Sequence, residues 1–378
     1  MEFLYEGLLA ITWQQIVMYL VGGLLIWLAI EKEYEASLLL PMGFGAILVN
    51  LPMSGVIDQI TQGVGETNGI IQWLFEAGIE ASEAFPLLLF IGIGAMIDFG
   101  PMLSNPKMFL FGAAAQFGIF FTLVVAVILG FDLKDAASTA IIAAADGPTS
   151  IYVANYFQST YQGAIMVAAY SYMALVPIIQ PHIIKAITTK KERLIRMEYS
   201  PSNVSKTTRI LFPIFVTIIA GTVAPKSAEL IGFLMFGNLI RECGVLDSLS
   251  QTAQNALANL VTLLLGISVA FRMQANDFLT WQTLLILALG LVGFVFDTVG
   301  GVFFAKFLNL FSKKKINPMI GAAGISAFPM ASRMVHKMGR DEDPYNFLLM
   351  HAAGANVSGQ IASVIAGGLI ITLVENLL

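Results

Sequence analysis

The chain has 378 residues, of which 57% are apolar and only 12% are charged. Soluble domains carry about 25% charged residues, so this composition, with a mean hydropathy of +0.78, excludes an ordinary soluble protein and predicts an all-α polytopic membrane protein. The single cysteine, Cys243, excludes an internal disulfide and a cysteine metal cluster. The three histidines lie far apart in the sequence, which argues against a zinc site.

The hydrophobic runs divide into two sets of six. A membrane-spanning helix needs about 20 apolar residues, and the runs fall at about 13–30, 37–51, 85–99, 108–130, 136–157 and 162–188, then at 210–224, 227–243, 255–271, 281–310, 316–338 and 346–376. A polar stretch separates the two sets. The pattern predicts an internal duplication, with an N-terminal membrane repeat at 1–188, a basic linker at 189–209 and a C-terminal membrane repeat at 210–378.

Short sequence similarities support this duplication. FGAILVNLP from Phe44 parallels FGNLIRECG from Phe236, and FIGIGAMIDF from Phe90 parallels LLGISVAFRM from Leu264. AAADGPTS in the fifth run parallels GAAGISAFP in the eleventh, and the order of the three pairs is preserved along the chain.

The fifth and eleventh runs are unusual for spanning helices, because each is interrupted by proline. Gly147-Pro148 lies in the middle of the fifth run, and Pro329 lies in the middle of the eleventh. Proline removes a helical hydrogen bond and clashes with the preceding turn. In a membrane, such breaks survive only where protein or a water-filled cavity covers the freed backbone. Paired breaks in two halves of a chain indicate a transporter's binding site, although two kinked, packed helices are the simpler alternative.

The distribution of lysine and arginine predicts the orientation in the membrane. Six basic residues place the linker in the cytoplasm, namely Lys190, Lys191, Arg193, Arg196, Lys206 and Arg209. If both broken runs are re-entrant, each half has about five spanning helices and the halves are inverted. Lys337 and Arg340 then face the cytoplasm, and the acidic loop 52–84 lies outside. If both broken runs cross, those two basic residues move outside, so the charge bias favours inverted repeats with both termini outside.

Asp146 is the strongest candidate for a functional residue. Charged residues at membrane depth are rare and point to function, and Asp146 lies at the break of the fifth run. Its carboxylate, the carbonyls freed at the break and the hydroxyls of Thr149 and Ser150 are oxygen ligands that suit a hard cation. The alternative is that Asp146 only caps the half-helix that follows it.

The eleventh run offers a matching half-site. Asn317 lies at its start, Ser326 before the proline break and Arg333 after it. Arg333 can bind a carboxylate through two parallel hydrogen bonds, or it can simply reach the lipid interface. In the twelfth run, the small-residue segment HAAGANVSGQIAS contains Asn356, which we expect to bond to a neighbouring helix or to line the site.

Three further polar residues in apolar runs are ambiguous. Tyr172 in the sixth run is compatible with a packed tyrosine or with a site residue. Asp98 lies at a helix end, which favours an interfacial role, whereas Asp297 lies within an apolar run. The chain has no GxxxxGK[ST] phosphate loop and no HExxH motif. No sequence around any lysine suggests that this chain itself carries biotin.

Several long motifs resemble those of one family. ADGPTSIYVAN, AYSYMALVPIIQP, MFGNLIRECGV and INPMIGAAGISAFPMASRM look like the beta subunits of biotin-dependent, sodium-translocating decarboxylases, from about residue 13 to the C-terminus. The resemblance implies functional roles for residues at the matching positions, namely Asp146, Tyr172, Asn317, Gly321, Ser326, Arg333 and Asn356. One departure is GANVSGQ, where relatives often have GPNVAG.

The resemblance implies an enzyme of the bacterial cytoplasmic membrane that decarboxylates carboxybiotin, consumes a proton and exports Na+. In this interpretation Asp146, Tyr172 and Arg333 are catalytic, and Asn317 and Arg333 bind the cofactor. Asp146, Asn317, Ser326 and Asn356 are then the Na+ ligands.

The implied partners are a carboxyltransferase alpha subunit, a biotin carrier protein that supplies carboxybiotin and a small single-helix subunit, together with membrane lipid and further copies of the chain. No nucleic acid is expected. The chain looks shorter than oxaloacetate-type subunits and is more similar to the acyl-CoA types. Of these, the glutaconyl-CoA type is expected above the methylmalonyl-CoA type. The alternative is a sodium-coupled secondary carboxylate transporter without decarboxylase activity.

Overall fold

The computed structural model describes residues 5–33, 35–61, 65–198 and 204–378, so part of the predicted linker lies outside the described residues. The described chain is helical apart from one antiparallel hairpin of β1 (Asp58–Thr61) and β2 (Gly65–Asn68). The all-α class is therefore confirmed with one small exception, which lies in the acidic loop expected at 52–84.

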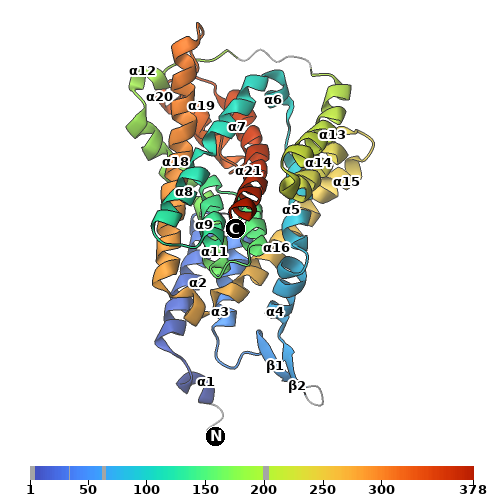
Figure 1. Ribbon diagram of the computed structural model, residues 1–378, viewed down its shortest axis with the longest axis vertical. Helices are drawn as coiled ribbons and strands as arrows, with labels where there is room; N and C mark the ends of the chain where they lie inside the picture. Colours follow the sequence, from blue (N-terminus) through green and yellow to red (C-terminus); the bar gives the residue numbers. More distant parts are fainter. Residues whose placement is uncertain (1–4, 34, 62–64, 199–203) are drawn as a thin grey trace.

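One group of six helices forms a continuous row, in which each helix packs against the next (Figure 1). In order along the row these helices are α2 (Trp13–Glu31), α3 (Ala36–Val49), α16 (Ala258–Val269), α5 (Ala84–Met96), α14 (Ala228–Glu242) and α13 (Lys206–Val223). Three come from each half of the sequence, so the halves interleave. We call this group the row.

The remaining long helices, together with shorter helical segments between them, form a second group, which we call the core bundle. It consists of α7 (Phe109–Ala115), α8 (Phe117–Ile128), α9 (Leu133–Ala140), η4 (Ile141–Ala144), α10 (Gly147–Tyr156), α11 (Gln162–Ile187), α18 (Trp281–Phe311), α19 (Met319–Ala322), α20 (Met330–Glu342) and α21 (Leu349–Leu377). Here α7 packs on α21, and α18 packs on both α8 and α11. Over the most apolar 18 residues of α21, 78% are buried by other parts of the chain. We therefore describe α21 as the central helix of the bundle.

Short elements connect these helices. They are α1 (Glu6–Leu9), α4 (Ile70–Phe75), η2 (Glu76–Glu80), α6 (Gly100–Ser104), η3 (Pro106–Met108), α12 (Lys190–Arg193), η5 (Pro225–Ser227), α15 (Asp247–Thr252), η6 (Ala253–Leu257), η7 (Ala270–Met273) and α17 (Ala275–Phe278). The expected loop 52–84 is thus partly helical. Its apolar residues Ile71 and Phe75 are buried, and that burial stabilises a helix where acidic side chains alone suggest a loop.

Glycine allows the closest helix crossings in the row. A Cβ on Gly94 of α5 would lie 1.9 Å from the carbonyl oxygen of Leu234 on α14, and a Cβ on Gly237 would lie 2.0 Å from that of Ile91. Only residues without a side chain fit such a contact, which is typical of helices packed in membranes.

Six helices in the described chain are long and apolar enough to span a membrane, or eight if each of two bent helix pairs counts as one span. One face of α2 exposes Trp13, Leu20, Leu24 and Trp27, as a lipid-facing helix does. By contrast, α3 has only 14 residues, a length of about 21 Å that is shorter than the hydrocarbon core of a membrane. The sequence therefore predicts a membrane span at 37–51, but the helix found there is shorter than a typical span.

Both predicted breaks are present, but the first one lies before the proline. After η4, Ala145 adopts the left-handed conformation with φ 51°, and Asp146 begins α10. Pro148 lies in the first turn of α10, where its missing N–H costs no helical hydrogen bond. The second break separates α19 from α20, which follows directly after Pro329.

Candidate functional site

The two broken segments meet inside the core bundle. The main-chain N–H and the hydroxyl of Ser326 both donate to the carbonyl oxygen of Ala144, at 3.3 and 2.7 Å. The freed backbone of one break is therefore satisfied by the other, which explains how irregular chain persists in a membrane protein. All of Ala143–Ala145 and Ser326 are buried.

Asp146 lies at this junction and is only 4% exposed. One carboxylate oxygen accepts the N–H of Thr149 at 3.2 Å, and the other accepts the hydroxyl of Ser363 at 2.6 Å. Asp146 thus does cap α10, as the simpler interpretation of the sequence held. The hydroxyl of Ser150 bonds to the main-chain oxygen of Asp146 rather than to its carboxylate.

The central helix α21 supplies three polar side chains to the same region. Ser363 contacts the Asp146 carboxylate, and the Gln360 amide donates to the carbonyl of Ser326. Asn356 donates to the carbonyl of Ile325 at 2.7 Å, while its own side-chain oxygen is buried without a partner in the described chain. Because these residues are spaced four and three apart, they lie on one face of α21.

A cavity of about 530 Å³ lies between the row and the core bundle. Asp146, Ser326, Gln360 and Arg333 line its core side, whereas residues of α3, α5 and α16 line its row side. The cavity therefore brings together a carboxylate from the first broken segment and a guanidinium from the second. Among the described residues, no carboxylate forms an ion pair with Arg333.

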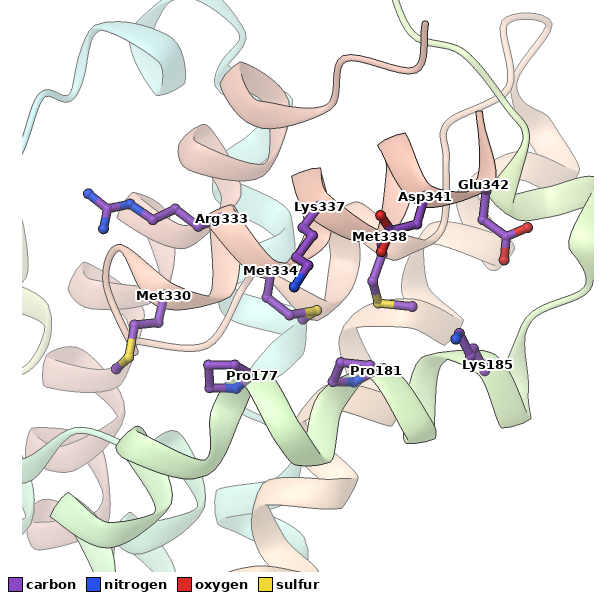
Figure 2. A pocket seen from close by; sticks show the side chains of 10 residues that line it. All are labelled: Pro177, Pro181, Lys185, Met330, Arg333, Met334, Lys337, Met338, Asp341 and Glu342. Atoms are coloured by element: carbon purple, nitrogen blue, oxygen red, sulfur yellow. The ribbon is translucent and has the colours of Figure 1, made fainter. Parts of the chain in front are cut away.

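A groove of about 580 Å³ lies next to this cavity, between α20 and the second half of α11 (Figure 2). Its apolar walls are formed by Pro177, Pro181, Met330, Met334 and Met338, and its polar lining includes Lys185, Lys337, Asp341 and Glu342. Arg333 lines both the groove and the cavity. A ligand that enters along the groove therefore reaches a guanidinium that lines the same cavity as Asp146.

The structure brings only part of the predicted set to the cavity. Tyr172 donates to the carbonyl of Leu287 and packs behind the site, whereas Tyr170, two residues earlier, lines the cavity. Asn317 does not line it. Its amide donates to the carbonyls of Arg193 and Ile195, both at 2.9 Å, so it fastens the linker to the start of α19. Neither arrangement tests the predicted roles, which stay predictions.

The two other aspartates differ from Asp146. Asp98 forms a 3.2 Å ion pair with Arg209, as an interfacial residue does. Asp297 is completely buried on α18 but does not line the cavity.

Four residues at or beside the cavity were not predicted from the sequence. Ser363 and Gln360 could have been found from the polar spacing along α21, since they share a face with Asn356. The sequence does not distinguish Tyr170 from Tyr172, because both tyrosines of the AYSYM motif are equally plausible as site residues. Glu35 gave no signal, because it lies outside the hydrophobic runs next to two other glutamates.

Known proteins match nearly the whole chain. A family model for the beta subunit of Na+-transporting oxaloacetate decarboxylase matches residues 14–374. The chain belongs to this family. The beta subunit of glutaconyl-CoA decarboxylase from Acidaminococcus fermentans is 48% identical over 369 residues, or 98% of this chain and 96% of that protein. That of methylmalonyl-CoA decarboxylase from Propionigenium modestum is 46% identical over 97% of this chain and 96% of its own length.

Oxaloacetate-type relatives match as completely. The beta chain of oxaloacetate decarboxylase from Klebsiella pneumoniae is 44% identical, covering 97% of both chains. The resemblance inferred from the motifs is therefore confirmed, and the chain is a subunit of a Na+-transporting decarboxylase. With its apolar spans, it is a multi-pass protein of the bacterial cytoplasmic membrane.

Proposed function

We propose that this chain decarboxylates carboxybiotin held by a partner subunit and couples the reaction to Na+ export with consumption of a proton. The family and the names of its relatives support the decarboxylation and the Na+ transport. Supply of carboxybiotin by a carboxyltransferase alpha subunit and a biotin carrier protein is what the resemblance implies. A small single-helix subunit and several copies of this chain complete the proposed complex.

One observation carries the proposal: Asp146 and Arg333 line the same cavity at the junction of two broken segments. Asp146 provides the negative charge that a transported cation needs in a low-dielectric site. Arg333 provides the planar donor pair that binds a carboxylate. Substrate anion and transported cation can therefore occupy one enclosure.

The groove in Figure 2 fits the arm that delivers the substrate. Its methionine and proline walls suit an apolar chain, and methionine adapts easily to irregular shapes. Lys185 and Lys337 are both exposed and attract a carboxylate to the groove. Arg333 then receives the carboxylate where groove and cavity meet. We therefore propose that carboxybiotin approaches along this groove.

The reaction balances with one proton. The bond between the ureido nitrogen and the carboxyl carbon breaks, CO2 leaves, and the electron pair that stays on nitrogen takes a proton. Protonation of Asp146 removes the charge that holds Na+, so the proton and the ion exclude one another at this carboxylate. Moving one charge against 100 mV costs about 2.3 kcal/mol, which the decarboxylation must supply. Tyr172, Asn317, Ser326 and Asn356 remain the other proposed participants.

The packing supports two inverted repeats with the proposed boundaries 1–188 and 210–378. In the predicted duplication, α3 and α5 of the first half correspond to α14 and α16 of the second. Each packs on the counterpart of the other, since α3 contacts α16 and α5 contacts α14. The same exchange holds for α7 and α11 against α18 and α21, since α7 contacts α21 and α11 contacts α18. We propose about five spans and one re-entrant segment in each repeat, with both termini outside. Coupling requires that loaded and empty states differ in conformation, and movement of the core bundle against the row would supply that difference.

Glutaconyl-CoA is the proposed substrate of the whole complex. Identity is 48% to the glutaconyl-CoA type, 46% to the methylmalonyl-CoA type and 44% to an oxaloacetate type. The alignment to the oxaloacetate type extends over 421 residues, against 369 for the glutaconyl-CoA type. Turnover of each of the three substrates by the purified complex tests this assignment.

The first experiment is to purify the chain and to measure CO2 release from carboxybiotin with and without Na+. We expect Na+ to stimulate release, and the chain in vesicles to accumulate Na+ while it turns over. If a folded chain, supplied with its partner subunits, moves Na+ with a carboxylate but releases no CO2, the secondary transporter is correct instead.

A further inference from the structure

The row side of the cavity carries an acidic residue of its own. Glu35 lies directly before α3 and lines the cavity, together with Ser37 and with Thr262 of α16. Asp146 lines the same cavity from the core bundle. Two carboxylates from different helix groups therefore line one enclosure, and a carboxylate in such an environment points to function.

Helix capping does not explain Glu35. Acidic side chains at this position commonly accept a hydrogen bond from the first turn of the helix, but no such bond is made at α3. Within the part of the chain that the structure describes, no cation pairs with the Glu35 carboxylate. The residue also adopts the left-handed conformation, with φ 36°, which costs a non-glycine residue about 1–3 kcal/mol.

Tyr170 supplies a second and independent observation. Its side chain is 2% exposed, it lines the cavity, and its hydroxyl has no hydrogen-bond partner among the described residues. The Tyr170 ring packs against Gly147, next to Asp146, and Glu35 lines the same cavity. A buried hydroxyl without a partner is costly, so a phenol oxygen in a cavity lined by two carboxylates is a natural ligand for a cation.

We propose that Glu35 and Tyr170 form a second Na+ site, on the row side of the cavity, through which Na+ reaches Asp146. This inference rests on the proposed function. The ligands would be the Glu35 carboxylate, the phenol oxygen and the nearby hydroxyls of Ser37 and Thr262, all of which are oxygen ligands suited to a hard cation. Two sites of moderate Na+ affinity allow the ion to pass from one to the other and leave, whereas a single site of very high affinity would retain it.

The test uses the full chain in its complex, with ²²Na+ as the probe. Glu35→Gln removes the charge and keeps the shape. We expect it to raise the Na+ concentration for half-maximal decarboxylation at least about tenfold, or about 1.4 kcal/mol of cation binding, while the rate at saturating Na+ changes little. Asp146→Asn should retain saturable ²²Na+ binding, and Asp146→Asn combined with Glu35→Gln should lose it.

Matched variants separate this site from a general charge effect. Glu31 lies four residues earlier, is exposed and does not line the cavity, so Glu31→Gln should leave the Na+ dependence unchanged. Tyr170→Phe should weaken Na+ binding less than Glu35→Gln does. If Glu35→Gln does not fold, Tyr170→Phe and Glu35→Asp report on the site instead.

Identical Na+ dependence for Glu35→Gln and Glu31→Gln would overturn the second site and leave the proposed function intact. Likewise, loss of all specific ²²Na+ binding in Asp146→Asn alone would assign every ion to Asp146. If the wild-type complex neither binds Na+ nor responds to it, the proposed function itself fails, and this result is distinguishable from the other two.

Discussion

The two broken segments have the same plan but opposite charge. The first segment places a carboxylate, Asp146, at its break, whereas the second places a neutral hydroxyl, Ser326, at the break and a guanidinium, Arg333, one turn into α20. Both face one cavity. Duplication alone would build two similar half-sites, so it is the difference in charge that allows one enclosure to bind a cation and a carboxylate.

The ends of the two segments are also held differently. In the first, Asp135 of α9 accepts hydrogen bonds from Ser159 at 2.5 Å and from Thr160 at 3.2 Å, which join the two ends of the segment to each other. In the second, Asn317 and Glu342 are tied to the linker, the latter through a 2.6 Å ion pair with Arg193. The first segment is closed on itself, whereas the second is fastened to the linker between the halves.

Replacing the carboxylate of the first segment should have the largest effect. Asp146→Asn removes the only charge at that break, and the loss of one buried charged partner is typically worth about 3–5 kcal/mol. We therefore expect Na+-stimulated CO2 release and Na+ transport to fall at least about a hundredfold. Asp247→Asn, at an exposed position on α15, is the control. Wild-type levels of either activity in Asp146→Asn would remove Asp146 from the mechanism.

Neutralising the second segment should separate decarboxylation from ion binding. Arg333→Gln loses a charge-assisted pair with the substrate, worth about 1.5–3 kcal/mol, so decarboxylation should fall about 10- to 100-fold. Equilibrium ²²Na+ binding should stay close to wild type. Arg340→Gln, two turns further along the same helix, should change neither quantity. A parallel loss of ²²Na+ binding in Arg333→Gln would contradict this division of roles.

The support for Asp146 from α21 can be tested with a pair of serines. Ser363→Ala removes the 2.6 Å hydrogen bond to the carboxylate, and a bond to a charged group is worth about 1.5 kcal/mol or more. The Na+ concentration for half-maximal activity should therefore change about tenfold. Ser358 instead bonds to the carbonyl of Met108, so Ser358→Ala should lower thermal stability without this change. Equal Na+ dependence in both variants would show that Ser363 only packs.

The sequence predicts some of these features and not others, for physical reasons. Asp146 and the two breaks are visible because a charge and a proline are costly in an apolar run. Ser363 and Tyr170 are not, because serine and tyrosine occur routinely in membrane helices, and only the tertiary packing shows which of them face the cavity. Glu35 is hidden for a similar reason, since its position depends on how α3 meets α16.

Asn317 illustrates a prediction that the structure sharpens. Sequence and resemblance suggest a Na+ or cofactor ligand, whereas the observed bonds hold the linker. Asn317→Ala removes one donor from the half-buried carbonyls of Arg193 and Ile195. The Arg193 carbonyl keeps its bond from Asn346, so the cost is that of the Ile195 carbonyl, about 1–3 kcal/mol. We expect a lower unfolding temperature. Asn346→Ala, which also loses a bond to the Arg193 carbonyl, should lower it similarly. A Na+ response that is weakened in Asn317→Ala but not in Asn346→Ala would support the proposed ligand role, whereas an unchanged Na+ response in both would limit Asn317 to holding the linker.

The smallest effect concerns the exposed end of the second segment. Arg196 lies 2.5 Å from Asp343 and lowers the pKa of that carboxyl below its usual range. A lowered pKa in the folded state means that the stabilisation is present above the ordinary value of about pH 4 and is lost as the pH falls through the lowered pKa. The Arg196 side chain is mostly exposed to solvent, so the contribution of the pair is small.

The difference in unfolding temperature between wild type and Asp343→Asn should therefore stay constant from about pH 8 to pH 5 and shrink below about pH 4. Asp341→Asn, whose carboxylate forms no ion pair within the described chain, should show no such change. High salt should reduce the Asp343 effect, because surface pairs are screened. A difference in unfolding temperature that grows on acidification would contradict a stabilising Arg196–Asp343 pair. The attachment of the second segment to the linker would then depend on the bonds of Asn317 and Asn346 and on the Arg193–Glu342 pair.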